Sequence, residues 1–125
     1  MTDRTKPEVE FPEGDAPTEL LLEDLTEGSG QEAAHGHTVA AHYVGVAWST
    51  RAEFDSSYDR GEPLRFPLGQ GMVIKGWEDG IVGMKVGGRR RITIPPELGY
   101  GARGAGGAIK PNETLVFVVD LVDVA

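Results

Sequence analysis

One stretch alone has the periodicity of an amphipathic helix, and this scarcity of helices most constrains the fold. In VIKGWEDGIVGM, apolar side chains recur at helical spacing at Ile74, Trp77, Ile81 and Met84. The stretch also holds three glycines, so the helix must be stabilised by packing its Trp77 face on a sheet. A parallel sheet needs a crossover helix between successive strands. One helix is too few for that, and we expect antiparallel strands.

Five stretches have the apolar content or the alternation of strands. The last, TLVFVVDLVDV, places Leu115, Phe117, Val119 and Leu121 on one face and is expected at the centre of the sheet. Together they predict an α+β protein with an antiparallel sheet of five to six strands. The stretches are residues 20–25, 38–46, 64–68, 89–94 and 114–124.

Two long connections lack such patterns. Residues 47–63, AWSTRAEFDSSYDRGEP, are polar apart from isolated aromatics, and we expect a loop leading into an edge strand. Residues 95–112, PPELGYGARGAGGAIKPN, are so rich in glycine and proline that no regular structure is expected.

The net charge of −8 is unevenly distributed along the 125 residues. Residues 1–32 carry ten acidic and two basic residues, whereas residues 33–125 carry ten of each. Residues 1–18 are acidic, contain three prolines and are expected to form an extended or disordered leader, followed by one domain at residues 19–125. A neutral domain with an acidic leader does not favour nucleic-acid binding.

Features that the sequence lacks exclude further classes of protein and of site. The chain has no cysteine, which excludes disulfide frameworks, thiolate metal sites and cysteine nucleophiles. No apolar run is long enough to span a bilayer, and the N-terminus lacks the pattern of a signal peptide. We expect a cytoplasmic, monomeric protein that does not enter membranes.

Two patterns that suggest bound groups have simpler interpretations. GYGARG at residues 99–104 matches the glycine spacing of dinucleotide-binding loops, but the AGGAIKPN that follows cannot form the helix that would face a phosphate. His35, His37 and His42 are close in sequence, yet imidazoles without a further committed ligand are weak evidence for a metal. We therefore expect neither cofactor nor metal.

Charged clusters are also weak indications of chemistry. Alternation places Arg89 and Arg91 on one face of their strand, and a solvated strand face is favoured over a phosphate site. Asp55, Asp59 and Glu62 come from one loop without a partner from another element, which argues against a glycosidase pair.

Aromatic residues at segment junctions give a more specific indication. We interpret Phe66 as core, but Trp77 in a helix and Tyr100 in a glycine-rich loop suggest an apolar concavity. Asp55 and the Tyr100 hydroxyl would supply polar groups at its edge, as in a small-ligand or peptide site. The set comprises Tyr43, Phe54, Phe66, Trp77, Tyr100 and Phe117.

At these residues the chain resembles FKBP-type peptidyl-prolyl cis/trans isomerases, the immunophilins that bind tacrolimus and rapamycin. The resemblance covers residues 19–125 and is carried by VAAHYVG, EFDSSYDRGEPLRFPLG, GMVIKGWEDGIVGMKVGGRRRITIPPELGYGARG and NETLVFVVDLVDV. It implies a half-barrel sheet wrapped around one short helix. It also implies catalysis of rotation about Xaa-Pro bonds, with proline-containing polypeptides as substrates and no cofactor.

The resemblance further implies roles for individual residues. Asp55 would accept a hydrogen bond from a macrolide, and Arg60 would orient Asp55 and Tyr43. The Ile74 backbone N–H would donate to a ligand carbonyl, and the Tyr100 hydroxyl would be a second donor. Trp77 would form the base of the pocket. The implied catalytic residues are Tyr43, Phe54, Asp55, Trp77, Tyr100 and Phe117, and the implied binding residues are Leu64, Met72, Val73, Ile74, Ala108 and Ile109.

Three positions depart from the family pattern, namely Leu64, Ala105 and Ala108, where bulkier or polar side chains are usual. We expect retained isomerase activity, an altered preference for the residue before proline and weaker macrolide binding. An alternative is a non-catalytic binding module or holdase that uses the same groove. The acidic leader suits a solubilising tail, or an arm that recruits a basic partner.

Overall fold

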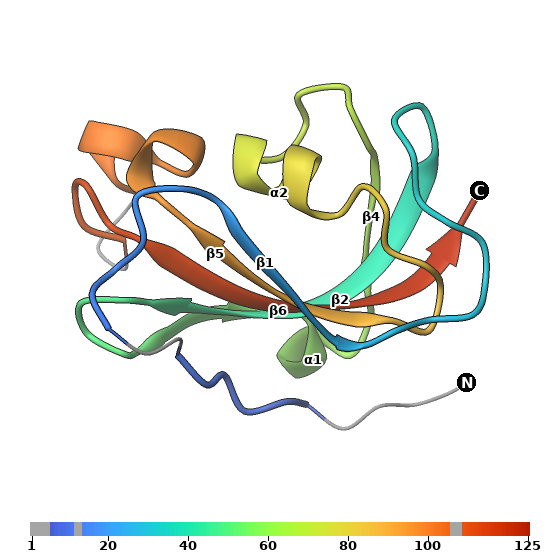
Figure 1. The fold of residues 1–125 in the computed structure, drawn as a ribbon, viewed down its shortest axis with the longest axis horizontal. Helices are drawn as coiled ribbons and strands as arrows, with labels where there is room; N and C mark the ends of the chain where they lie inside the picture. Colours follow the sequence, from blue (N-terminus) through green and yellow to red (C-terminus); the bar gives the residue numbers. More distant parts are fainter. Residues whose placement is uncertain (1–5, 12–13, 106–108) are drawn as a thin grey trace.

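The computed structural model describes residues 6–11, 14–105 and 109–125 (Figure 1). All paired strands are antiparallel and follow the order β1-β5-β6-β2-β3, with β4 pairing only to β2. The predicted α+β class with a six-stranded antiparallel sheet is therefore confirmed. The strands are β1 (Leu21–Thr26), β2 (Thr38–Ala47), β3 (Glu53–Ser56), β4 (Leu64–Pro67), β5 (Arg89–Ile94) and β6 (Leu115–Val124).

The two longest strands, β2 and β6, form the centre of the sheet and pair from Val39 opposite Val124 to Ala47 opposite Leu115. As predicted, alternate residues of β6 face the core, which lies between the sheet and helix α2 (Lys75–Gly80) (Figure 1). Core side chains that are fully or almost fully buried include Val39, Leu68, Ile81, Ile92, Ile94, Leu115, Val119 and Leu121.

Helix α2 confirms the predicted helix but ends earlier than the periodicity suggested, at Gly80. Gly76 explains how so short a helix is stabilised. A Cβ at Gly76 would lie 2.6 Å from the Ile94 side chain on β5, so only glycine lets the helix backbone approach the sheet this closely. The contact buries Trp77 to 4% exposure. Tertiary packing, rather than helix propensity, therefore stabilises α2.

The structure corrects the interpretation of both long connections. The first contains strand β3 and a one-turn helix, α1 (Ser57–Arg60), so the described part of the chain has two α-helices instead of the single one expected. The second contains two single-turn 3₁₀ helices, η1 (Pro96–Leu98) and η2 (Gly101–Arg103), where no regular structure was predicted. Glycine and proline disfavour long α-helices, but they permit such isolated turns.

The prediction of a solvated arginine face on β5 is also wrong. Arg89 and Arg91, which form that face, are only partly exposed, and Arg90 on the other face is buried, because each guanidinium pairs with an acid on a neighbouring strand. The ion pairs are Arg89–Asp120 at 2.6 Å, Arg90–Asp24 at 2.7 Å and Arg91–Glu23 at 2.5 Å. The basic run therefore joins β5 to β6 and β1 by side-chain contacts.

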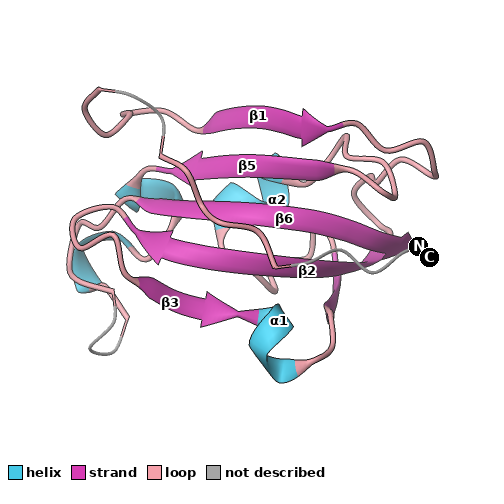
Figure 2. Cartoon of the chain, turned by 90° about the horizontal axis from the view of Figure 1, so that it is seen from below, coloured by secondary structure: helices cyan, strands magenta, loops and turns pink. Residues whose placement is uncertain are grey.

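The face of the sheet opposite α2 is crossed by the N-terminal part of the chain (Figure 2). Residues 6–11 have no regular secondary structure but contact the domain through Lys6, Glu10 and Phe11. Within the described part of the chain, no helix combines the length and apolar character that crossing a bilayer requires.

Candidate functional site

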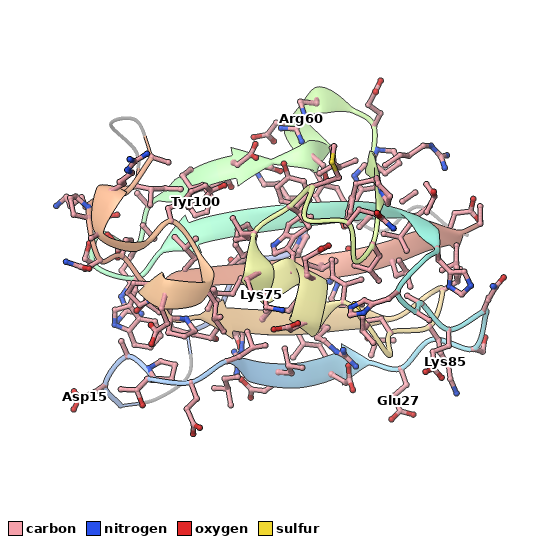
Figure 3. All side chains as sticks on the ribbon, turned by 90° about the horizontal axis from the view of Figure 1, so that it is seen from above. Asp15, Glu27, Arg60, Lys75, Lys85 and Tyr100 are labelled. Carbon is pink, nitrogen blue, oxygen red and sulfur yellow. The ribbon has the colours of Figure 1, made fainter. Side chains whose placement is uncertain are left out.

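A pocket of about 170 Å³ opens between α2, the β3 edge of the sheet and the η1–η2 turns. Figure 3 looks onto this face, with Lys75 of α2 near the middle and both Arg60 and Tyr100 toward the β3 edge. Ten residues predicted for the site line the pocket, namely Tyr43, Phe54, Asp55, Leu64, Met72, Val73, Ile74, Trp77, Tyr100 and Phe117.

Four aromatic rings form the apolar part of the pocket. Trp77 contacts Tyr43 and Phe117 edge to face, with ring centroids 4.8 and 5.2 Å apart, and Phe54 contacts Phe117 at 5.5 Å. Each such pair contributes about 0.5–1.5 kcal/mol beyond the area it buries. Phe66 packs against Trp77 at 5.6 Å from the core side, as predicted. These contacts fix the orientation of the Trp77 indole.

A β-bulge explains why two successive residues of β3 line one pocket. Val46 pairs with Glu53 and Gly45 pairs with Asp55, so Phe54 is the extra residue in the bulge. Regular alternation would send Phe54 and Asp55 to opposite faces, whereas a bulge re-aims a side chain. The bulge thereby brings an aromatic ring and a carboxylate to the same pocket wall.

Gly45, which sequence reasoning did not single out, makes room for the aromatic wall. A Cβ at this position would lie 2.7 Å from both the Phe54 and the Phe117 ring. The two rings therefore pack directly over the backbone of β2. A glycine inside a strand pattern signals such a close approach, and this signal was available in the sequence.

The Asp55 carboxylate is held by two donors. Tyr43 donates its hydroxyl proton to Asp55 Oδ2 at 2.5 Å, and Arg60 donates to Asp55 Oδ1 at 2.7 Å. A second Arg60 nitrogen donates to the Tyr43 hydroxyl at 2.8 Å, closing the triangle. The prediction that Arg60 orients Asp55 agrees with this geometry.

The same contacts set the ionisation of these groups. Partial burial alone would raise the pKa of Asp55, but hydrogen bonds from Tyr43 and Arg60 and the Arg60 charge together lower it below its ordinary value. Burial, followed by the hydrogen bond to Asp55, raises the pKa of Tyr43. At neutral pH the site thus presents a carboxylate acceptor beside a protonated phenol.

Tyr100 lies at the rim, 40% exposed, at the N-cap of η2. Burial and, to a smaller extent, the charge of Asp55 raise the pKa of Tyr100, so its hydroxyl remains protonated and can donate at neutral pH. Met72 also lies at the pocket edge, where its apolar side chain is 67% exposed.

Glu78 of α2 is a further residue that sequence reasoning missed. Its carboxylate is buried at 6% exposure and accepts the backbone N–H groups of Gly69 and Gly71 at 2.9 and 2.8 Å. These bonds hold the turn that leads directly into residues 72–74 of the pocket. An acid in a helix next to a glycine-rich turn is the only sequence signal for this contact.

The two remaining predicted binding residues are Ala108 and Ile109. Ile109 is buried at 5% exposure in the hydrophobic core and is not among the residues that line the pocket. Ala108 lies outside the described residues.

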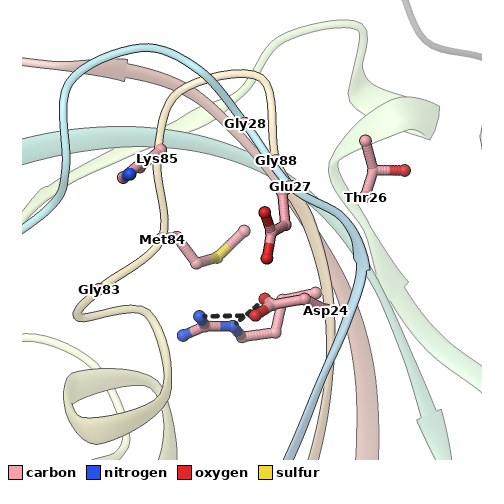
Figure 4. A pocket seen from close by; sticks show the side chains of 9 residues that line it. Asp24, Thr26, Glu27, Gly28, Gly83, Met84, Lys85 and Gly88 are labelled. Atoms are coloured by element: carbon pink, nitrogen blue, oxygen red, sulfur yellow. Dashed lines mark hydrogen bonds and ion pairs between the residues drawn. The ribbon is translucent and has the colours of Figure 1, made fainter.

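A second cavity, of about 200 Å³, lies at the end of β1 against the loop at residues 83–88 (Figure 4). Its most buried charged group is Arg90, which donates to Asp24 and to the backbone carbonyls of Gly80 and Val82. These contacts satisfy the guanidinium within the protein. The cavity therefore presents a structural ion pair rather than an open binding group.

The three histidines noted in the sequence contact different parts of the protein. His35 contacts the Glu78 carbonyl, His37 accepts the Ala34 N–H, and His42 contacts Ser57. Across residues 6–11, 14–105 and 109–125, no three His, Asp or Glu side chains are grouped so that they could hold a metal ion.

Comparisons of the sequence and of the fold with known proteins identify the same family. Residues 29–122 match the family model described as FKBP-type peptidyl-prolyl cis-trans isomerase. The chain is 59% identical over 120 residues to an FK506-binding protein of Streptomyces anulatus, covering 95% of this chain and 97% of the relative. It is 55% identical over 106 residues to an FK506-binding protein of Neisseria meningitidis serogroup A, covering 84% and 95%.

Two solved structures have similar folds. AtFKBP13 aligns with a TM-score of 0.79 at 42% identity, covering 88% of this chain and 96% of that protein. FkpA from Escherichia coli aligns with a TM-score of 0.76 at 44% identity, covering 84% of this chain and 47% of the FkpA chain.

Proposed function

The chain belongs to the FKBP-type peptidyl-prolyl cis-trans isomerase family, and on that basis we propose that its pocket over Trp77 accelerates rotation about Xaa-Pro bonds in polypeptides. The observation that carries the proposal is the combination of a rigid aromatic base with a fixed carboxylate at its edge. A volume of about 170 Å³ equals roughly six water molecules at about 30 Å³ each, enough for one prolyl ring and its flanking amide.

The proposed mechanism needs no covalent step. Rotation about the Xaa-Pro bond has a barrier of about 18–20 kcal/mol because the planar amide is stabilised by resonance. Water favours this planar, charge-separated form. An apolar pocket removes that water and so favours a twisted state, in which resonance and charge separation are weaker. A 10⁶-fold acceleration corresponds to about 8 kcal/mol of differential stabilisation.

Polar groups at the edge would orient the bound chain. The prolyl ring would lie against Trp77, between the rings of Tyr43 and Phe117, while the Ile74 N–H and the Tyr100 hydroxyl donate to carbonyls on either side. Asp55 would accept a hydrogen bond from the ligand. Its fixed geometry supports this role, because a preorganised acceptor loses little entropy on binding.

The same pocket is proposed to bind macrolides of the FK506 and rapamycin class. Support comes from the relatives, which are FK506-binding proteins, and from the apolar lining. Leu64 lines the pocket with less area than an aromatic ring would offer. We therefore expect macrolide binding that is weaker than in relatives with an aromatic side chain there.

A protease-coupled assay on a series of Xaa-Pro peptides tests the activity, with Trp77→Ala, Asp55→Val and Tyr100→Phe as pocket variants. Lys85→Ala, which changes an exposed residue beside the second cavity, is the control. Catalysis that rapamycin abolishes, and that falls in folded pocket variants but not in the control, supports the proposal. Rates equal to buffer with rapamycin still bound would instead identify a non-catalytic binding module.

A further inference from the structure

The N-terminal residues 6–11 lie on the face of the sheet opposite the pocket (Figures 1 and 2). With the domain they border an open groove of about 360 Å³, to which β2 contributes Val44 and Val46. Both valines are nearly fully buried, with 2% and 6% exposure, although they face away from the main core. We call residues 6–11 the strap.

Phe11 anchors the strap to the turn between β2 and β3. Its ring contacts Trp48 edge to face with centroids 5.1 Å apart, and the Arg51 guanidinium lies 3.9 Å from the Phe11 ring centroid. Both the aromatic pair and the cation–π contact favour the docked position of Phe11. Arg91 of β5 also donates to the Glu10 carbonyl at 2.7 Å. The strap is therefore attached both to the β2–β3 turn and to strand β5.

Lys6 connects the strap to the elements that build the polar side of the pocket. Its ammonium group lies 2.9 Å from a carboxylate oxygen of Glu53 on β3 and 3.0 Å from one of Asp59 on α1. Glu53 immediately precedes the two pocket residues of the bulge, and Asp59 immediately precedes Arg60. One cation thus bridges the strand that supplies Asp55 and the helix that supplies its guanidinium partner.

β3 is the element of the pocket that most needs external support. It is four residues long, lies at the edge of the sheet and pairs with β2 through a ladder that the bulge interrupts. Short edge strands with interrupted ladders open more easily than central strands. Contacts on the far side of β3 can therefore change how well the pocket wall is ordered.

We propose that the strap is a positioning segment, which orders β3 and α1 from behind and so keeps Asp55 and Arg60 in their productive geometry. The consequence for catalysis rests on the isomerase function proposed above. This role differs from those of a solubilising tail or a recruiting arm, because it requires the strap to dock on its own domain.

The kinetic test compares Lys6→Ala, Phe11→Ala and the double variant with the unmodified chain. We expect kcat/KM for a Leu-Pro peptide to fall about twofold to fivefold with Lys6→Ala, because losing exposed ion pairs should lower the population of ordered β3 by about that factor, and up to about tenfold in the double variant. Lys6→Arg should retain activity, because it keeps the charge. Glu8→Ala, an exposed change in the same segment, is the matched control and should have no effect.

A second readout separates the strap from the proposed function. With 5-fluorotryptophan, Trp48 reports docking of the strap, and amide hydrogen exchange of residues 53–56 reports the order of β3. Phe11→Ala should shift the Trp48 resonance and speed amide exchange in β3 about threefold to tenfold. Glu8→Ala should change neither the resonance nor the exchange rate.

An unchanged kcat/KM in the double variant of an active chain would overturn the inference, because the strap would then not position the pocket. A Trp48 resonance that does not respond to Phe11→Ala would show that the strap is undocked, which overturns the inference. A shifted Trp48 with unchanged exchange in β3 would show docking without positioning, which also overturns it. If the unmodified chain fails to catalyse isomerisation, the proposed function fails by itself, and β3 exchange still decides whether the strap orders the wall.

Discussion

The substitution Gly45→Ala tests whether the aromatic wall depends on close packing over the β2 backbone. The added methyl group would lie 2.7 Å from both the Phe54 and the Phe117 ring. Carbon atoms prefer separations of about 3.5–4.0 Å, so the rings must retreat by about 1 Å. The expected loss of activity follows from this displacement, because both rings belong to the pocket wall.

We expect Gly45→Ala to lower kcat/KM for a Leu-Pro peptide by about 10- to 100-fold, since a misplacement of about 1 Å in a site can cost about 10²-fold. Overpacking should also lower the free energy of unfolding by about 1–3 kcal/mol. Activity is measured in the protease-coupled assay and stability by urea unfolding.

A matched control separates the two effects. Val39→Ala changes a fully buried residue of the same strand that does not line the pocket. It should cost about 2 kcal/mol of stability while leaving kcat/KM within about threefold. Adding Phe54→Leu to Gly45→Ala should recover part of the lost stability, because it relieves the clash on the Phe54 side and leaves the one with Phe117. Full activity in Gly45→Ala, or an equal loss in Val39→Ala, would refute the reasoning.

Three further predictions concern the polar side of the site. Arg60→Ala should raise the pKa of Asp55 toward its ordinary value. Because that pKa is lowered in the folded protein, the contribution of Asp55 to stability is present above its ordinary value of 3.8 and is lost as the pH falls through the folded value. Carboxyl NMR should therefore find Asp55 titrating at higher pH in Arg60→Ala; an unchanged titration would contradict this. Glu78→Ala leaves two backbone N–H groups without their acceptor and should lower the free energy of unfolding by about 2–4 kcal/mol. Amide exchange across residues 69–74 should also become faster. Asp79→Ala, an exposed change in the same helix, is the control, and an equal loss of stability in both variants would argue against a special role of Glu78. Tyr100→Phe should reduce kcat/KM about twofold to tenfold and leave thermal stability nearly unchanged, because the side chain is 40% exposed; a large drop in stability would contradict the rim position.

Strong local patterns made several elements predictable from sequence. The observed β5 has the predicted bounds, residues 89–94, and β6 begins one residue after the predicted start. Both carry alternating apolar residues that the sheet buries on one face. The antiparallel class also followed from the shortage of helices, which is a global property of the chain.

Elements defined by tertiary contacts could not be predicted in this way. In β3 the bulge at Phe54 breaks the period of two on which strand detection rests. The four residues of α1 are polar, and only Ser57 is buried, so no apolar periodicity marks the helix. The arginines of β5 looked solvated because their acidic partners lie on strands that are distant in sequence.

The candidate site was easier to predict from the sequence than the fold elements that carry it. Resemblance to family motifs gathered residues from four regions of the chain, and ten of these line one pocket. Periodicity alone would not have brought Asp55 and Tyr100 together, because both lie in segments without a regular pattern. Ile109 packs in the core, and its binding role stays a prediction.

The central claim is that the pocket over Trp77 catalyses Xaa-Pro rotation. The most direct measurement is NMR exchange spectroscopy of a Leu-Pro peptide with a small molar fraction of the chain, before and after one equivalent of rapamycin. Uncatalysed exchange takes tens to hundreds of seconds. With the chain present we expect cis–trans exchange cross-peaks within about one second, far faster than the uncatalysed rate, and rapamycin should remove them. Exchange that stays at the uncatalysed rate, or that rapamycin leaves unchanged while binding at the pocket, would contradict it.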